Sequence, residues 1–181
     1  MRSSFLWLTF ALLITGCNKS PSASPPVSVA KPPVKLETVN FDSIMDRVKG
    51  HAGKVVVMDT WSTSCEPCMR EFPGLVALAQ KYPHDKLACI SVSLDYEGLG
   101  TPAEQEERVL GFLKEKDARL ENFLSSTPSE DVYKALKLPS IPAVFVYDRD
   151  GKLAQRFDAS FAGGKPFTYK DIEAKVVELL K

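Results

Sequence analysis

Residues 55–73 read VVVMDTWSTSCEPCMREFP. An apolar, β-branched run opens this segment and predicts a buried strand, which a short polar turn follows. The turn ends at Cys65-Glu66-Pro67-Cys68, where an apolar pattern with helical spacing begins. Two thiols at this spacing can close a small disulfide ring. The order of strand, turn, cysteine pair and helix therefore indicates a redox site rather than a purely structural disulfide.

Strands and helices are predicted to alternate along the rest of the chain. Apolar residues spaced three and four apart predict helices, and short β-branched runs predict strands. This alternation gives parallel strand pairs, and a turn at residues 148–151 adds an antiparallel hairpin. The predicted fold class is therefore α/β, with a mixed central sheet and helices on both faces. Strands are expected at 34–39, 54–60, 87–94, 120–124, 143–147 and 152–157, and helices at 41–48, 65–81, 102–117, 129–136 and 168–180, the last with Ile172, Val176, Val177 and Leu180 facing the core.

The N-terminal part is predicted to be a targeting segment followed by a tether. Arg2 supplies a positive charge, and residues 5–14 form an apolar run that is too short for a permanent membrane-spanning helix. The motif Ile14-Thr15-Gly16-Cys17 resembles a bacterial lipobox, in which the peptide is cut before a cysteine that receives lipid. An ordinary secretory signal cut nearby, or an uncleaved anchor, is the alternative. We expect a signal peptide at 1–16, the lipidated Cys17 and a tether rich in Pro and Ser at 17–36, and one domain at 37–181.

Such a leader predicts a location in the bacterial cell envelope, outside the cytoplasm, with a lipid anchor in a membrane. Disulfides persist in that environment, so a cysteine pair can carry out exchange chemistry. Cys89 lies in a strand-like run and is expected to be a small buried apolar side chain. The chain has 23 basic and 23 acidic residues, so its formal net charge is zero and no feature favours nucleic-acid binding.

The cysteine pair carries the expected chemistry. A thiolate is the form that attacks a disulfide, and the N-terminus of a helix favours a negative charge. Cys65 at that end is the predicted nucleophile, and Cys68, one turn later, is the predicted resolving thiol. A single pair could instead be half of a zinc site, but only His51, His84 and Cys89 could complete it, and none is paired at ligand spacing. We therefore expect no metal, and no cofactor besides the redox-active disulfide.

Two acidic residues flank the pair. Asp59 ends the predicted strand, where a partly buried carboxyl group would have a raised pKa and could exchange a proton with Cys68. The alternative is a strand-end aspartate that makes turn hydrogen bonds. Glu71 lies one turn after Cys68 on the same helix face, where it could shuttle a proton or could simply be a solvated helix residue.

Pro142 begins another predicted strand. A proline there must lie at the edge or the start of a strand. A cis Ile141–Pro142 bond would expose the Ile141 backbone for pairing with an extended substrate, although most X–Pro bonds are trans.

These motifs carry a resemblance to the thioredoxin superfamily. Asp59-Thr60-Trp61, Cys65-Glu66-Pro67-Cys68, Glu71-Phe72-Pro73 and Ile141-Pro142 stand in its order and spacing. The segment from Cys65 to Pro73 resembles the TlpA/ResA-like extracytoplasmic branch of thiol-disulfide oxidoreductases. The similarity covers about residues 37–181.

The resemblance implies a role for each motif residue. Cys65 and Cys68 would be the redox pair and Pro142 the cis-proline that faces them, with Ile141 and Trp61 beside the substrate. Asp59 matches the buried acid of thioredoxins, and Glu71 matches the active-site glutamate of ResA-like proteins. Residues 96–117 resemble the helix-bearing insertion that this branch carries after the strand at 87–94, so the implied fold is thioredoxin-like.

The sequence departs from the family pattern at two positions. Ser64 stands where a Trp usually precedes the first cysteine, and Ser140 stands where a Gly often lies two residues before the cis-proline. Loss of the Trp removes a flat apolar wall beside the thiols. This departure bears on partner choice and redox potential more than on the chemistry.

The function expected from the residues and the resemblance is a membrane-anchored thiol-disulfide oxidoreductase. It would exchange disulfides with extracytoplasmic proteins as a reductant, for example in cytochrome c maturation, with apocytochrome c and a membrane thiol donor as partners. A thiol peroxidase of the same superfamily is one alternative. A non-catalytic binding domain of the envelope, in which the cysteine pair is a structural disulfide, is the other.

Overall fold

The computed structural model describes residues 31–159 and 166–181 of the 181-residue chain. The expected signal peptide and the lipid site at Cys17 lie outside the described residues, so both stay predictions. Pro32–Lys181 forms one compact unit. Within the described ranges, none of the helices combines the length and the apolar character needed to cross a bilayer.

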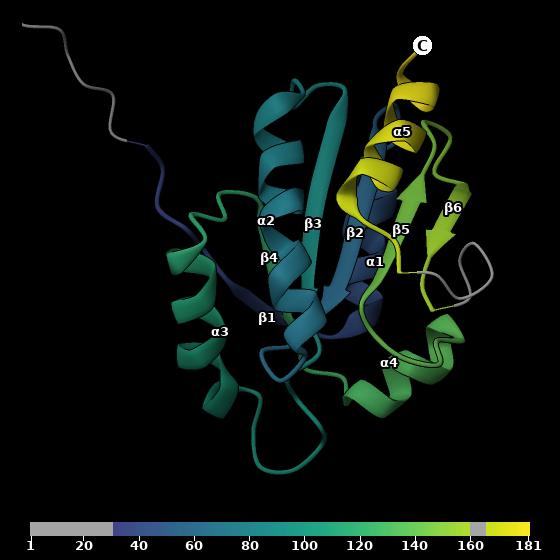
Figure 1. Ribbon diagram of the computed structural model, residues 1–181. Helices are drawn as coiled ribbons and strands as arrows, with labels where there is room; N and C mark the ends of the chain where they lie inside the picture. The colour runs from purple at the N-terminus through teal and green to yellow at the C-terminus, as the bar shows by residue number, and fades with distance from the viewer. Residues whose placement is uncertain (1–30, 160–165) are drawn as a thin grey trace, which may run out of the picture. The chain divides into compact units, whose positions relative to one another are not determined.

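A six-stranded mixed sheet forms the centre of this unit (Figure 1). The strand order is β1-β4-β3-β2-β5-β6. The pairs β1–β4, β4–β3 and β3–β2 are parallel, whereas β5 pairs antiparallel with both β2 and β6. The strands are β1 (Glu37–Val39), β2 (Val55–Trp61), β3 (Leu87–Ser93), β4 (Glu121–Ser125), β5 (Ala143–Tyr147) and β6 (Leu153–Phe157).

Helices cover both faces of the sheet. The core on one face joins α2, α3 and α5 to the side chains of Val55, Val57 and Trp61 on β2. The core on the other face joins α1 and α4 to Val56 and Met58 of the same strand. In Figure 1, α2 and α5 lie side by side in front of the sheet. The helices are α1 (Phe41–Gly50), α2 (Glu66–Lys81), α3 (Ala103–Glu115), α4 (Ser129–Leu136) and α5 (Tyr169–Leu180).

The central position of β2 and β3 explains their composition. Every residue of both strands is buried, because parallel strands with helices on both faces contact no solvent. The hydroxyl groups of Thr60, Ser91 and Ser93 in these strands have partners; the Ser91 hydroxyl, for example, donates to Asn122 Oδ1 on β4 at 2.8 Å. A polar residue at the end of either strand therefore enters a largely dry environment.

The structure confirms the predicted α/β class, the mixed sheet and the helix-bearing insertion between β3 and β4. The predicted first strand is shorter than expected, since only Glu37–Val39 pairs with β4. The expectation that Val177 faces the core is wrong, because this side chain is 40% exposed. Ile172 and Val176 are fully buried and define the inner face of α5, and the next residue is turned about 100° away from it.

Candidate active site

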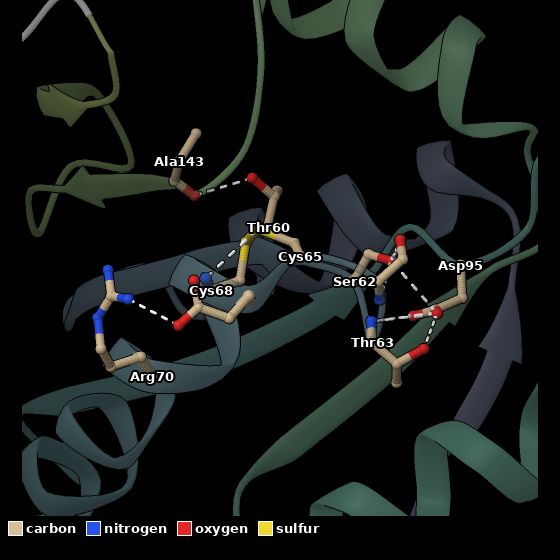
Figure 2. Close-up of a disulfide and its surroundings, with 10 residues drawn as sticks. Thr60, Ser62, Thr63, Cys65, Cys68, Arg70, Asp95 and Ala143 are labelled. Carbon is tan, nitrogen blue, oxygen red and sulfur yellow. Dashed lines mark hydrogen bonds and ion pairs between the residues drawn. A yellow bond between two sulfur atoms is a disulfide. The ribbon is translucent and has the colours of Figure 1, made fainter.

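Cys65 and Cys68 are joined by a disulfide at the start of α2 (Figure 2). Cys65 is the N-cap of the helix, and its Sγ accepts a hydrogen bond from the backbone N–H of Cys68 at 3.3 Å. Cys65 is half-buried, whereas Cys68 is only 3% exposed. When the bond is reduced, the helix N-terminus favours a thiolate on Cys65, the sulfur that solvent and a partner can reach.

Asp95, which follows β3, organises the turn that precedes Cys65. Its side chain is fully buried, and its oxygens accept hydrogen bonds from the Thr63 N–H at 3.1 Å, from the Thr63 hydroxyl and from the Ser62 hydroxyl at 3.3 Å (Figure 2). The Ser93 hydroxyl also donates to it at 2.6 Å. Arg108 of α3 donates to Oδ1 of Asp95 at 3.0 Å and balances its charge. The turn is thus tied to both β3 and the inserted helix.

Ser64 takes the place of the usual family Trp within this polar network. Its hydroxyl lies 2.8 Å from the Ser62 hydroxyl, and its N–H donates to Ser62 Oγ at 3.1 Å. Ser64 is exposed and small, so position 64 itself presents no aromatic ring beside the disulfide.

Trp61 corrects the expectation that it lies beside the substrate. Its side chain is fully buried, so it offers no surface to a substrate in this structure. The indole packs against Phe72 of α2 and Phe112 of α3, with ring centroids 4.9 Å and 4.8 Å away. The physical reason is strand parity: Trp61 lies on the same face of β2 as Val57, the face that α2 and α3 cover. Trp61 is therefore part of the core that α2 and α3 form with β2.

Asp59 lies within β2, two residues before its end, and is only 4% exposed, so it is more fully buried than the sequence predicted. Its pKa is raised from 3.8 to about 7, mainly because the carboxyl group is buried; the hydrogen bond from Tyr169 lowers the pKa, and the charge of Glu71 raises it. The Tyr169 hydroxyl donates to Oδ2 across 2.5 Å. Oδ1 is buried and has no hydrogen-bond partner among the described residues. A carboxyl group with a pKa near neutrality can both accept and return a proton.

Glu71 and the Ile141–Pro142 pair line one cavity beside the disulfide. The cavity has a volume of about 340 Å³ and is lined by the first turns of α2, the segment before β5, and residues 158–159 and 166–168. Pro67, which lies between the two cysteines, is one of its lining residues. The Ile141–Pro142 bond is cis, and both residues are half-buried. The Glu71 side chain is 30% exposed and lies 4.0 Å from Arg70. The structure therefore brings Glu71, Ile141 and Pro142 together, while their roles stay predictions.

The part of the chain that the structure describes shows no group of side chains that would make the cysteine pair half of a zinc site. Residues 31–159 and 166–181 contain no cluster of three His, Cys, Asp or Glu side chains that could hold a metal ion. His51 bonds Glu121 at 2.6 Å instead of approaching the cysteines. Cys89 is free and buried, and desolvation raises its pKa to about 12, so it is an unreactive thiol.

Three partners of the site were not identified in the sequence. Asp95 carried a usable signal, since it lies two residues after the end of the buried parallel strand β3. The ion pair of Arg108 could have been predicted only after Asp95 had been identified as a buried acid, because an arginine on an exposed helix face carries no signal of its own. Tyr169 gave no local signal, because it contacts Asp59 from 110 positions away.

Comparison with known proteins places this site in a family. A family model described as thioredoxin-like matches residues 53–153, which include β2, the cysteine pair and β5. The chain belongs to the thioredoxin-like family. The match spans more than half of the chain and contains the disulfide and the cis-proline, so it confirms the resemblance seen in the sequence.

Individual relatives agree with this thioredoxin-like assignment. The chain is 27% identical over 108 residues to the thiol-disulfide oxidoreductase ResA of Bacillus thuringiensis subsp. konkukian, a match that covers 60% of this chain and 57% of ResA. The chain therefore aligns with little more than half the length of this curated relative.

Solved structures show the same fold. A thiol-disulfide isomerase from Corynebacterium glutamicum superposes with a TM-score of 0.59 at 18% identity, over 83% of this chain and 96% of that one. StoA from Bacillus subtilis superposes with a TM-score of 0.51 at 20% identity, over 68% of this chain and 82% of that one. At these identities the likeness shows the thioredoxin-like fold alone.

Proposed function

We propose that this protein is a thiol-disulfide oxidoreductase that exchanges disulfides with other proteins. The observation that carries the proposal is the position of the Cys65–Cys68 disulfide, at the N-terminus of α2 and next to the cavity lined by Ile141 and Pro142. The Cys65 sulfur is accessible, so it can attack a partner's disulfide, whereas Cys68 is covered and can attack only the mixed disulfide that forms on Cys65. The name of the ResA relative supports the same activity.

The reaction follows from the geometry. Reduced Cys65 attacks the partner's disulfide as a thiolate, forms a mixed disulfide and releases one partner thiolate. Cys68 then loses its proton, attacks Cys65 Sγ and releases the second partner thiolate. Two electrons pass from the protein dithiol to the partner, and the Cys65–Cys68 bond forms again.

A finer proposal concerns direction, location and partner. We propose that the protein acts as a reductant in the cell envelope, held to a membrane by lipid on Cys17, with apocytochrome c as one partner and a membrane thiol donor as the source of electrons. The lipobox-like sequence and the similarity to the TlpA/ResA-like branch support this view.

Insulin reduction in the presence of dithiothreitol tests the activity. The wild-type chain should accelerate precipitation of the insulin B chain, and Cys65→Ser should not. Cys89→Ser is the matched control, because it removes a buried free thiol and leaves the disulfide intact. Equal rates for wild type and Cys65→Ser would overturn the proposal.

Two further experiments address the finer proposal. The reduced protein should reduce an oxidised peptide that contains Cys-X-X-Cys-His, the attachment motif of c-type haem. In cells, Cys17→Ala should move the protein from the membrane fraction to the soluble fraction. A Cys17→Ala protein that stays in the membrane fraction would remove the lipid anchor from the account.

A further inference from the structure

Tyr169, which is half-buried, pairs with the buried Asp59 beneath the redox site. Tyr169 is the first residue of α5, and its hydroxyl donates to Asp59 Oδ2 at 2.5 Å. The start of α5 is held by a capping box, in which the side chains of Thr168 and Asp171 each bond the other's backbone N–H. The phenol therefore approaches Asp59 from a well-anchored helix end.

Gly74 of α2 makes this approach possible. A Cβ at position 74 would lie 2.3 Å from Cγ and 2.5 Å from Cβ of Tyr169. These atoms are close to the Tyr169 backbone, so they cannot move aside without moving α5. The tyrosine ring thus passes directly over the backbone of the helix that carries the disulfide.

Titratable groups from several elements surround Asp59. Cys68 and Glu71 of α2 lie on the same face of the sheet as Asp59. Cys89 of β3 lies on this face too. From β5 the paired residue is Val144, which does not titrate. Tyr169 is the group from α5, and burial together with Asp59 raises its pKa well above 10.

The two oxygens of Asp59 differ in their surroundings. Oδ2 is occupied by the Tyr169 hydroxyl, whereas Oδ1 is buried and has no hydrogen-bond partner in the described ranges. A buried, charged carboxyl oxygen without a donor is costly, and this cost favours the protonated form of the Asp59 side chain. Oδ1 is thus the oxygen available for a proton.

We propose that Tyr169 is a positioning residue of the exchange reaction: it holds Asp59 by Oδ2 and so keeps Oδ1 free to accept the Cys68 proton. This inference rests on the proposed function, since it concerns the resolving step. In that step the Cys68 proton passes to Asp59, the Cys68 sulfur bonds to Cys65 Sγ, and the bond between Cys65 and the leaving thiolate breaks. Asp59 later returns its proton to solvent or to Cys68 when the pair is reduced again.

The resolving step can be watched separately from the first attack. The reduced protein is mixed with an aromatic disulfide whose thiolate product is coloured, and the release is followed by stopped flow. The first phase reports attack by Cys65, and the second reports release by Cys68. The second-phase rate is then measured against pH.

Tyr169→Phe tests the proposal, because it keeps the ring packed on Gly74 and removes only the hydroxyl. A hydrogen bond to the charged form lowers the pKa of a carboxyl group, so its loss should move the midpoint of the second phase upward by about one to two pH units. At pH 6 the second phase should slow about tenfold or more, while the first phase keeps its pH dependence. Asp59→Asn should remove the wild-type midpoint altogether.

Tyr82→Phe is the matched control. The Tyr82 hydroxyl also joins α2 to α5 by bonding a carboxylate, Glu173, at 2.8 Å, but it lies at the opposite end of α2 from the disulfide. Its profile should equal that of the wild type. An unchanged second-phase midpoint in Tyr169→Phe, or an equal shift in Tyr82→Phe, would overturn this inference alone. A wild-type protein without any second phase would overturn the proposed function instead.

A measurement on the wild type keeps the inference testable if Tyr169→Phe does not fold. The Tyr169 hydroxyl proton should be visible by NMR as a slowly exchanging signal that shifts as Asp59 titrates. A hydroxyl proton that exchanges freely, or that does not respond to the Asp59 titration, would contradict the arrangement.

Discussion

Arg108 on α3 donates to Oδ1 of Asp95 at 3.0 Å, although the arginine side chain is 57% exposed and the aspartate is fully buried. The pair joins the inserted helix to the turn that precedes Cys65, because Asp95 also accepts hydrogen bonds from Ser62 and Thr63. The inserted segment is therefore part of the support of the redox site and not only an addition to the sheet.

The first prediction concerns this support. Asp95→Ala should lower the free energy of unfolding by about 2–4 kcal/mol, because several buried donors lose their acceptor. It should also slow disulfide exchange, since the turn before Cys65 is no longer held. Arg108→Ala should cost only about 1 kcal/mol, because the arginine is more than half exposed. Urea denaturation and the insulin assay measure the two effects.

Lys134→Ala is the control for Asp95→Ala. Lys134 pairs with Glu130 at 2.8 Å, but both side chains are exposed on α4, so the free energy of unfolding should stay close to that of the wild type. If the Asp95→Ala variant is no less stable than the Lys134→Ala variant, the buried hydrogen bonds of Asp95 do not hold the turn before Cys65.

The second prediction follows from the buried Asp59. Its pKa of about 7 in the folded state lies above the ordinary value of 3.8, so the folded state binds this proton more tightly than the unfolded state does. The stabilisation from this proton is complete below about pH 4 and is lost as the pH rises to about 7, at roughly 1.4 kcal/mol per pH unit at most. Asp59→Asn should remove this slope.

The measurement is the difference between the unfolding free energies of wild type and Asp59→Asn at several pH values. Since all other groups are shared, the difference isolates Asp59. A difference that is constant from pH 4 to pH 8 would mean that the Asp59 pKa is close to its ordinary value.

The third prediction concerns Gly74 and its contact with Tyr169. Gly74→Ala should destabilise the protein by about 1–3 kcal/mol, because overpacking exceeds the gain of about 1 kcal/mol in helix propensity. Gly111→Ala on α3 is the matched control, since its Cβ would meet nothing within 4 Å. That variant should be more stable by about 0.5–1 kcal/mol. Thermal denaturation compares them, and a Gly74→Ala protein as stable as Gly111→Ala would contradict the close approach.

Much of this fold could be predicted from the sequence because its strongest signals are local. The buried runs of β2 and β3 and the pattern around the cysteine pair are each readable within about ten residues. The long-range pairings of the site were not readable in this way. Tyr169 meets Asp59, and Arg108 meets Asp95, only after the sheet and helices have packed, so no spacing in the sequence announces them.

For Trp61, a local sequence motif led to a wrong prediction. The family pattern marked it as a substrate contact, whereas its burial against Phe72 and Phe112 makes it a core residue. Its position in the motif was informative, but only packing decides which side of the turn an aromatic ring occupies.

The fourth prediction concerns Ser64. Ser64→Trp should restore an aromatic surface beside Cys65 without disturbing the core, because Ser64 is exposed. We expect exchange with peptide disulfides flanked by apolar residues to become faster by about threefold to tenfold, since an aromatic contact contributes about 0.5–1.5 kcal/mol. Exchange with glutathione disulfide should change little. Equal effects on both substrates would mean that Ser64 influences the thiols themselves and not the choice of partner.

The reduction potential of the Cys65–Cys68 disulfide tests the account most directly. The measurement equilibrates the full chain with thiol–disulfide buffers of known potential and determines the reduced fraction by mass after alkylation. A disulfide that takes part in exchange should show a reversible two-electron transition with a potential above about −300 mV, within reach of biological thiol donors. A potential well below about −300 mV would make the disulfide a structural cross-link and would contradict the proposed exchange chemistry.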